Sequence, residues 1–192
     1  MRSTALGLVF VLFVAAGCGG DAPEEAWTRI ETDGMTAKQV EQRTRGLAAK
    51  QALFGRLVSR LGQAMADGPA SAVHVCKIAA PDITTNVGEA EGLRIGRTSH
   101  RLRNPKNTPP AWAAPYVARK TSSEVWMTHP DGRLAGLLPI PTMGMCLQCH
   151  GPWAGITQPV RKALAEHYPD DRAYDFRAGD LRGWFWLEIP PR

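Results

Sequence analysis

The stretch SEVWMTHPDGRLAGLLPI, residues 123–140, predicts a β-hairpin. Its arms, 123–128 and 133–140, are rich in aromatic and aliphatic residues, and the PDG segment between them favours a tight reversal of the chain. A buried strand is predicted at 184–189, where the sequence is WFWLEI, and another at 93–102. Because strands joined by a tight turn pair antiparallel, these segments predict a small antiparallel sheet.

Helices are expected around these strands. A long one is predicted at 33–67, whose first residue, an aspartate, can cap it and whose apolar residues recur at helical spacing. A second helix is expected from 70 to about 79, with Pro81 bending or restarting it, and others follow Pro109–Pro110 and span 158–167. The chain is therefore predicted to be a single α+β domain.

The N-terminus has the features of an export signal. Residues 1–17 combine an early positive charge, an apolar run at 5–14 and small residues before Cys18. This arrangement resembles a bacterial lipobox, although Ala15 stands where a leucine is usual. We expect a signal peptide over 1–17, a lipidated N-terminus and linker over 18–32, and a periplasmic, membrane-anchored lipoprotein, with simple secretion as the alternative.

Charge and cysteine content are both interpreted in the light of export. The chain carries a formal net charge of +5, and a basic exported protein rarely meets nucleic acid, so anionic lipid, an acidic partner or the carboxylates of a cofactor are expected instead. With Cys18 lipidated, Cys76, Cys146 and Cys149 remain, an odd number that does not suit a disulfide framework. At least one thiol therefore needs a chemical use.

The sequence CLQCH at 146–150 indicates covalent attachment of one haem c. In such a motif Cys146 and Cys149 add to the haem vinyl groups, and His150 becomes an axial ligand of the iron. A thiol–disulfide pair would require a helix beginning at the first thiol, and none is predicted at Cys146. A structural zinc site would require more ligands, usually from a second cysteine pair, and the sequence has none.

The second axial ligand is left open by the residues alone. Candidates are His74, Cys76, His100, Met127, His129, Met143, Met145 and His167. Met143 and Met145 are tied too close to the proximal side to reach the opposite face. Cys76 lies on the apolar stripe of its predicted helix while His74 points outward, so Cys76 is either a ligand or a buried filler. His129 is the next candidate.

Three segments resemble a known family. They are the helix bearing Cys76, IGRTSHRLRNPKNTPPAW at 95–112, and YPDDRAYDFRAGDLRGWFWLEIP at 168–190, combined with the Cys-x-x-Cys-His motif. Together they resemble a family of bacterial single-haem c proteins, formerly a domain of unknown function, found in cyanobacterial soluble haem proteins and on the outer side of sensor kinases. The resemblance covers about 35–190, and its most specific marks are 103–107 and 179–183.

The resemblance implies a PAS-like, haem-binding domain over 33–192, with Cys76 as the axial ligand opposite His150. Arg97, Arg101 and Arg103 are candidates to hold the haem propionates, or else form a solvated basic edge. The expected function is redox sensing, sensing of NO or CO, or electron transfer to a partner protein. The alternatives are a peroxidase-like or thiol–disulfide oxidoreductase, which is less favoured, and a structural lipoprotein whose paired cysteines form a disulfide.

Overall fold

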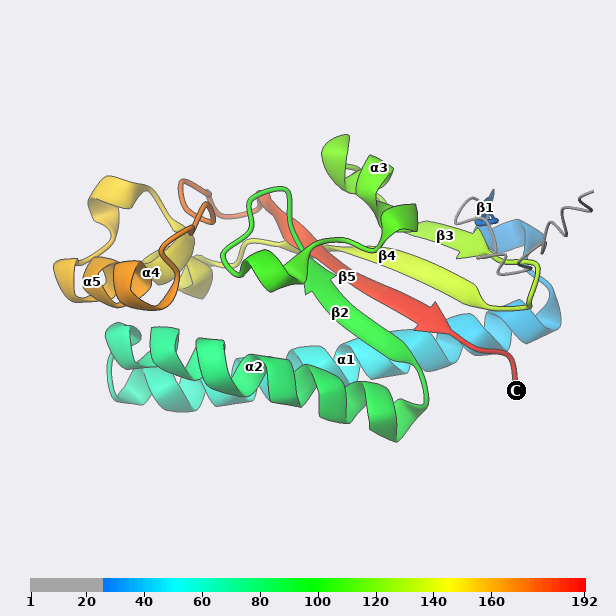
Figure 1. Cartoon of the computed structure of the whole chain (residues 1–192), viewed down its shortest axis with the longest axis horizontal. Helices are drawn as coiled ribbons and strands as arrows, with labels where there is room; N and C mark the ends of the chain where they lie inside the picture. The colour runs from blue at the N-terminus through cyan, green and yellow to red at the C-terminus, as the bar shows by residue number, and fades with distance from the viewer. Residues whose placement is uncertain (1–25) are drawn as a thin grey trace, which may run out of the picture.

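The computed structural model describes residues 26–192 and contains one five-stranded antiparallel sheet in the order β1-β3-β4-β5-β2 (Figure 1). The strands are β1 (Thr28–Ile30), β2 (Arg94–Thr98), β3 (Val125–Thr128), β4 (Leu134–Pro141) and β5 (Leu181–Ile189). The α-helices are α1 (Ala37–Ala66), α2 (Pro69–Glu91), α3 (Ala114–Ala118), α4 (Leu147–His150) and α5 (Gln158–His167). This confirms the predicted α+β class, with a long N-terminal helix and an arrangement consistent with a PAS-like core.

The hairpin that dominates the sequence pattern forms as predicted. Strands β3 and β4 pair from Val125 opposite Leu137 to Thr128 opposite Leu134. Gly132 closes the turn with a φ of +86°, a conformation that residues with a side chain rarely adopt. Strand β5 then pairs with β4 along nearly its whole length, which places the C-terminal strand inside the sheet, between β4 and β2.

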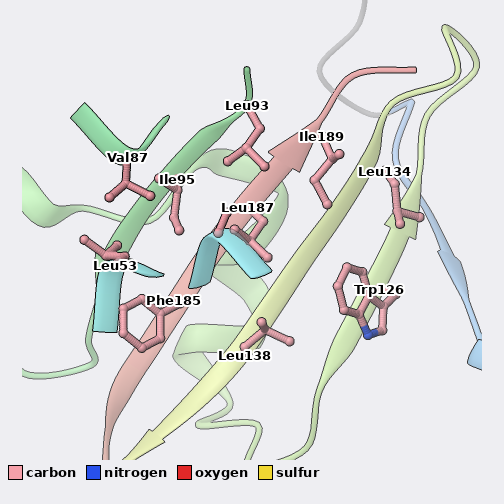
Figure 2. Close-up of a cluster of buried hydrophobic side chains, with 11 residues drawn as sticks. Leu53, Val87, Leu93, Ile95, Trp126, Leu134, Leu138, Phe185, Leu187 and Ile189 are labelled. Atoms are coloured by element: carbon pink, nitrogen blue, oxygen red, sulfur yellow. The ribbon is translucent and has the colours of Figure 1, made fainter. Parts of the chain in front are cut away.

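Both faces of the sheet are buried. On the face toward α1 and α2, the side chains of Trp126, Phe185 and Leu187 belong to one buried cluster with Leu53 of α1 and Val87 of α2 (Figure 2). The opposite face carries a second cluster of buried residues, Trp112, Ala113, Val117, Val125, Met127, Ala135, Leu137 and Trp184. Burying each large side chain contributes roughly 1.5–3 kcal/mol, so the two clusters together fix the strand register.

Helix α1 begins four residues later than predicted. Thr36 is its N-cap: the hydroxyl oxygen accepts a hydrogen bond from the backbone N–H of Gln39, and the Gln39 side chain accepts one from the N–H of Thr36. Asp33, the expected cap, lies instead in η1 (Thr32–Gly34), a short 3-10 helix. The reciprocal capping box satisfies two free N–H groups of the helix, which explains why the helix begins here.

Helix α2 continues through Pro81, where a bend or restart was predicted. The proline is exposed, whereas Ala80, Val87 and Gly88 are buried. Packing of this inner side maintains the helix even though proline cannot donate to the preceding turn. Gly92 then ends the helix in the left-handed conformation, with a φ of +61°.

Three further local predictions need correction. The segment predicted as a strand at 93–102 is a strand only over β2, because the Ser99 side chain turns the chain by bonding to Arg182 and Arg101. Strand β1 forms within the segment assigned to a linker, and it pairs with β3. A short helix does begin at the C-x-x-C-H motif, formed by η4 (Gly144–Cys146) and α4.

Three further 3-10 turns are η2 (Pro105–Asn107), η3 (Ala111–Ala113) and η5 (Trp153–Gly155). The predicted helix at 158–167 is confirmed as α5.

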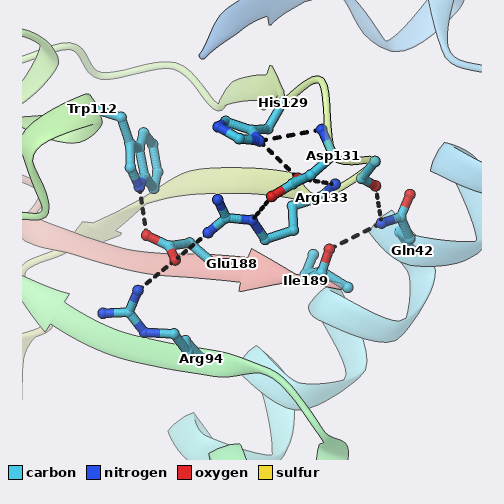
Figure 3. Close-up of polar contacts among 9 residues, drawn as sticks. Gln42, Arg94, Trp112, His129, Asp131, Arg133, Glu188 and Ile189 are labelled. Carbon is cyan, nitrogen blue, oxygen red and sulfur yellow. Dashed lines mark hydrogen bonds and ion pairs between the residues drawn. The ribbon is translucent and has the colours of Figure 1, made fainter. Parts of the chain in front are cut away.

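A buried carboxylate joins the sheet to the hairpin. Glu188 of β5 accepts a hydrogen bond from Nε1 of Trp112 at 2.9 Å and one from the Arg94 guanidinium at 2.6 Å, and Arg133 lies 3.7 Å away (Figure 3). Gln42 of α1 donates to the carbonyls of Gly132 and Ile189. These bonds satisfy polar groups inside the fold and fix α1 against the sheet.

Within residues 26–192, no helix combines enough length and apolar character to cross a membrane. The predicted signal peptide at 1–17 and the proposed lipidation site Cys18 lie outside the described residues.

Candidate cofactor site

A deep cavity opens between α1, α2, the ends of β2 and β5, and the motif segment η4–α4. It has a volume of about 240 Å³ and opens to solvent at its mouth. One wall is apolar and comes from the helical stripe of α1: Phe54, Leu57, Val58, Leu61 and Met65. The cavity therefore suits a mostly apolar ligand that lies against α1.

All three reactive residues of the C-x-x-C-H motif line this cavity. Cys146 ends η4, and Cys149 and His150 lie in the single turn of α4. Gly151 ends the turn, and a Cβ there would lie 2.5 Å from the carbonyl oxygen of Leu147, so only glycine fits. The turn thus directs two thiols and an imidazole into one space.

His150 is oriented by its backbone neighbour. Its Nδ1 lies 2.6 Å from the carbonyl oxygen of Ala173, so this nitrogen carries the proton and donates. Burial, followed by the charges of Arg182 and Arg103, holds the pKa of His150 well below its ordinary value. The ring is therefore neutral at pH 7. Its unprotonated Nε2, which lies 3.5 Å from Nη1 of Arg103, is the nitrogen that could act as a ligand, as in metal-bound histidines whose other nitrogen donates to a carbonyl.

Cys76 reaches the same cavity from α2. Burial raises the pKa of the Cys76 thiol, with a partly opposing effect from Arg97 and Arg103. As predicted, His74 lies on the exposed side of the helix, where its ring is 5.0 Å from that of His167. Burial also raises the pKa of Cys149, and the Cys76 thiol is among the nearby groups that raise it further. The thiol of α2 and those of the motif therefore share one site.

The remaining ligand candidates divide by position. Met143 and Met145 line the cavity on the motif side. His129 is paired with Asp131 at the hairpin turn, with 2.7 Å between Nδ1 and Oδ1, and Met127 is buried on the opposite face of the sheet. His100 lines a separate cavity beside Phe176. The cavity that contains the motif residues is therefore not lined by Met127, His100, His129 or His167.

The predicted arginines do not all reach the cavity. Arg97 lines it, and so does Arg103. Arg101 points elsewhere: its guanidinium donates to the carbonyls of Tyr174 and Asp175 and stacks over Phe176. Arg182, which sequence reasoning missed, lines the cavity from β5. The sequence did offer a reason to consider Arg182, because it lies within 179–183, one of the two segments most specific to the family resemblance.

Thiol chemistry and metal clusters can be compared with this geometry. Cys76, Cys146 and Cys149 are unbonded thiols. Reactive dithiols require a lowered pKa, whereas burial raises the pKa of Cys76 and of Cys149. Over residues 26–192, no group of three or more histidine, cysteine or acidic side chains is arranged to hold a metal ion by itself.

The fold and the cavity together define a class, an α+β cofactor-binding domain with a PAS-like sheet. The chain belongs to the Tll0287-like family, whose model matches residues 23–190. Among solved structures it is similar to the crystal structure of the cyanobacterial heme-protein Tll0287, with 25% sequence identity and a TM-score of 0.51, over 71% of this chain and 94% of that chain. No curated protein matches the chain. The predicted relationship to a family that includes a cyanobacterial haem protein is confirmed.

Proposed function

We propose that this chain is an exported c-type haem protein that holds one haem covalently and acts in redox or gas sensing or in electron transfer. The observation that carries the proposal is the convergence of Cys146, Cys149 and His150 with Cys76 in one apolar cavity. The family relationship to a cyanobacterial heme-protein supports haem as the cofactor. When bound, haem supplies one-electron redox chemistry and an iron that can bind small gases.

The residues present fit this cofactor. The apolar wall of α1 can pack against a porphyrin face, and the neutral His150 lines the cavity with its Nδ1 held by the Ala173 carbonyl. Arg97 and Arg182 line the cavity without a carboxylate partner among residues 26–192, which suits them to the two propionates. Arg97 and Arg182 thus replace the earlier group of Arg97, Arg101 and Arg103 as proposed propionate ligands.

Cys76 is the proposed second axial ligand. Burial raises the pKa of its thiol, but a coordinating metal deprotonates a thiol outright. An anionic sulfur donates electron density and favours ferric over ferrous iron, so a low reduction potential is expected. If reduction weakens this bond, the position becomes available to CO or NO, which supports a redox-gated sensor.

An enzyme is the competing class. A peroxidase needs an open distal face with acid–base groups, and ligation by Cys76 would deny that space. A thiol–disulfide oxidoreductase needs a stabilised thiolate, which the raised pKa of Cys149 opposes. Export, lipidation at Cys18 and a periplasmic location are parts of the proposal that rest on the N-terminal sequence alone.

The first experiment is absorption spectroscopy, oxidised and reduced, of a fragment that begins after Cys18 and is exported by a host able to mature haem c. Cys76→Ser is compared with the parent, and His74→Ala, two residues away on the outer side of α2, is the matched control. We expect covalent haem with a low-spin ferric spectrum that only Cys76→Ser shifts. A spectrum indifferent to Cys76→Ser would remove Cys76 as a ligand and favour plain electron transfer. Absence of haem would leave a dithiol protein.

A further inference from the structure

Arg103 and Asp171 form a buried ion pair beside the motif. Nε of Arg103 lies 3.0 Å from Oδ2 of Asp171, and the two side chains are 12% and 7% exposed. Arg103 lies in the loop after β2 and Asp171 in the loop after α5. The pair therefore joins these two loops next to α4, where Arg103 contacts the carbonyl of Cys149. A shielded pair of this kind keeps each charge fixed in position, because neither side chain can be freed without leaving the other charge buried alone.

The remaining guanidinium nitrogens contact the backbone that holds His150. Nη2 of Arg103 donates to the carbonyls of Cys149 and, at 3.2 Å, Ala173. The Ala173 carbonyl is also the acceptor for Nδ1 of His150, and the N–H of Ala173 donates to the second oxygen of Asp171 at 2.8 Å. The pair therefore holds the backbone on both sides of the hydrogen bond that orients the imidazole: Ala173, which supplies the acceptor, and Cys149, which precedes His150.

This arrangement has an electronic consequence. The more negative the acceptor of the Nδ1–H bond, the more basic the imidazole and the stronger its donation at Nε2. A guanidinium that donates to the same carbonyl oxygen makes this oxygen a weaker acceptor for the Nδ1–H of His150. The positive charge of the guanidinium also favours the ferrous state of a nearby iron. Nη1 of Arg103 lies 3.5 Å from Nε2 of His150, so the charge is close enough to act. Asp171 opposes both effects by partly neutralising Arg103.

We propose that Arg103 and Asp171 are a positioning and tuning pair for His150: Arg103 raises the reduction potential of the site, and Asp171 limits that rise. The inference rests on the proposed function, since it requires a haem ligated by His150. It gives Arg103 a role distinct from holding a propionate, because the guanidinium is already engaged by Asp171 and two carbonyls.

The test is a spectroelectrochemical titration of the haem-loaded chain. Arg103→Met is expected to lower the potential, Asp171→Asn to raise it, and the double variant to lie near the parent. Arg101→Met is the matched control, because Arg101 also binds backbone carbonyls of the 174–175 segment but does not contact the motif. Arg103→Lys, which keeps the charge but loses the fork of donors, should retain most of the potential while broadening the electron paramagnetic resonance signal.

A purely structural role would give a different pattern. Loss of packing would shift Arg103→Met and Asp171→Asn in the same direction, and either that result or an Arg103→Met effect no larger than that of Arg101→Met would overturn the inference. If Arg103→Met does not fold, Asp171→Asn and Arg103→Lys still decide. Absence of covalent haem in the parent is a failure of the proposed function itself. In the haem-free chain, nitrogen NMR of His150 provides a separate readout: Arg103→Met should change its Nδ1–H signal and Arg101→Met should not.

Discussion

Arg97 and Arg182 reach one cavity from the neighbouring strands β2 and β5, and neither has a carboxylate partner among residues 26–192. Burial, followed by the charges of Arg103 and Arg97, lowers the pKa of Arg182 to about 10. Both side chains are half-buried, and charges of the same sign that are partly withdrawn from water are costly unless an anion compensates them.

Replacement of Arg182 by methionine should therefore have opposite effects in the two forms of the protein. Without haem, Arg182→Met removes a desolvated charge and should raise the free energy of unfolding by about 1 kcal/mol. With haem, the variant loses a charge-assisted bond to the proposed propionate and should be less stable than the parent by about 1.5–3 kcal/mol. Urea unfolding of both forms measures this. Equal destabilisation of the two forms would contradict the assignment.

The close contact of β5 with β2 leads to a second prediction. A Cβ added at Gly183 would lie 2.2 Å from the backbone carbonyl oxygen of Thr98, which cannot move without separating the strands at the cavity floor. We expect Gly183→Ala to destabilise the protein by about 1–3 kcal/mol. Gly62→Ala on the exposed side of α1 is the control: nothing lies within 4 Å of the added methyl, and it should stabilise by about 0.5–1 kcal/mol. Thermal or urea unfolding distinguishes the two.

Local signals were enough to predict some elements. The hairpin at 123–140 and helix α5 carry strong turn residues and clear periodicity, and both form with nearly the predicted bounds. Strand β1 has only three residues, and its stability comes from pairing with β3, a contact that no local pattern reveals. The predicted end of α2 near 79 was wrong for the same reason, since packing of the buried side of this helix outweighs the hydrogen bond lost at Pro81.

The sequence predicted the kind of site, but it predicted only some of the residues that line the cavity. The C-x-x-C-H motif and Cys76 were predicted from the sequence, and all of these residues line the cavity. The arginines were harder, because residues alternate across a strand only while the strand lasts. Arg97 lies within β2, but Arg101 follows the turn at Ser99, where alternation no longer predicts direction. Arg182 reaches the cavity through sheet topology, which the sequence does not specify.

His100 provides a third prediction, concerning mildly acidic pH. Burial, followed by the charges of Lys120, Arg101 and Arg182, lowers the pKa of His100 in the folded state. The unfolded chain then binds more protons than the folded one, so stability should fall as the pH drops below the ordinary histidine value of about 6.5. His100→Gln cannot titrate and should lose part of this dependence.

The melting temperature of the haem-loaded protein, followed between pH 7 and pH 5, measures the effect. His74→Gln, at an exposed position on α2, is the control and should keep the slope of the parent. If His100→Gln leaves the dependence of the melting temperature on pH unchanged, groups other than His100 cause the loss of stability at acidic pH.

Asp131, at the hairpin turn, provides the last prediction. Although desolvation opposes the shift, hydrogen bonds from the backbone and guanidinium of Arg133 and from His129 lower the pKa of Asp131 to about 2. A lowered carboxyl pKa stabilises the folded state above the unfolded value of 3.8, and that contribution is lost as the pH falls toward 2. Asp131→Asn keeps an acceptor for the Arg133 N–H but carries no charge. The variant should therefore melt below the parent at pH 6, and the gap should close between about pH 4 and pH 2. Asp82→Asn, at an exposed position of α2, should show no such closing gap. A gap for Asp131→Asn that stays constant down to pH 2 would mean that its charge contributes nothing to holding the hairpin turn.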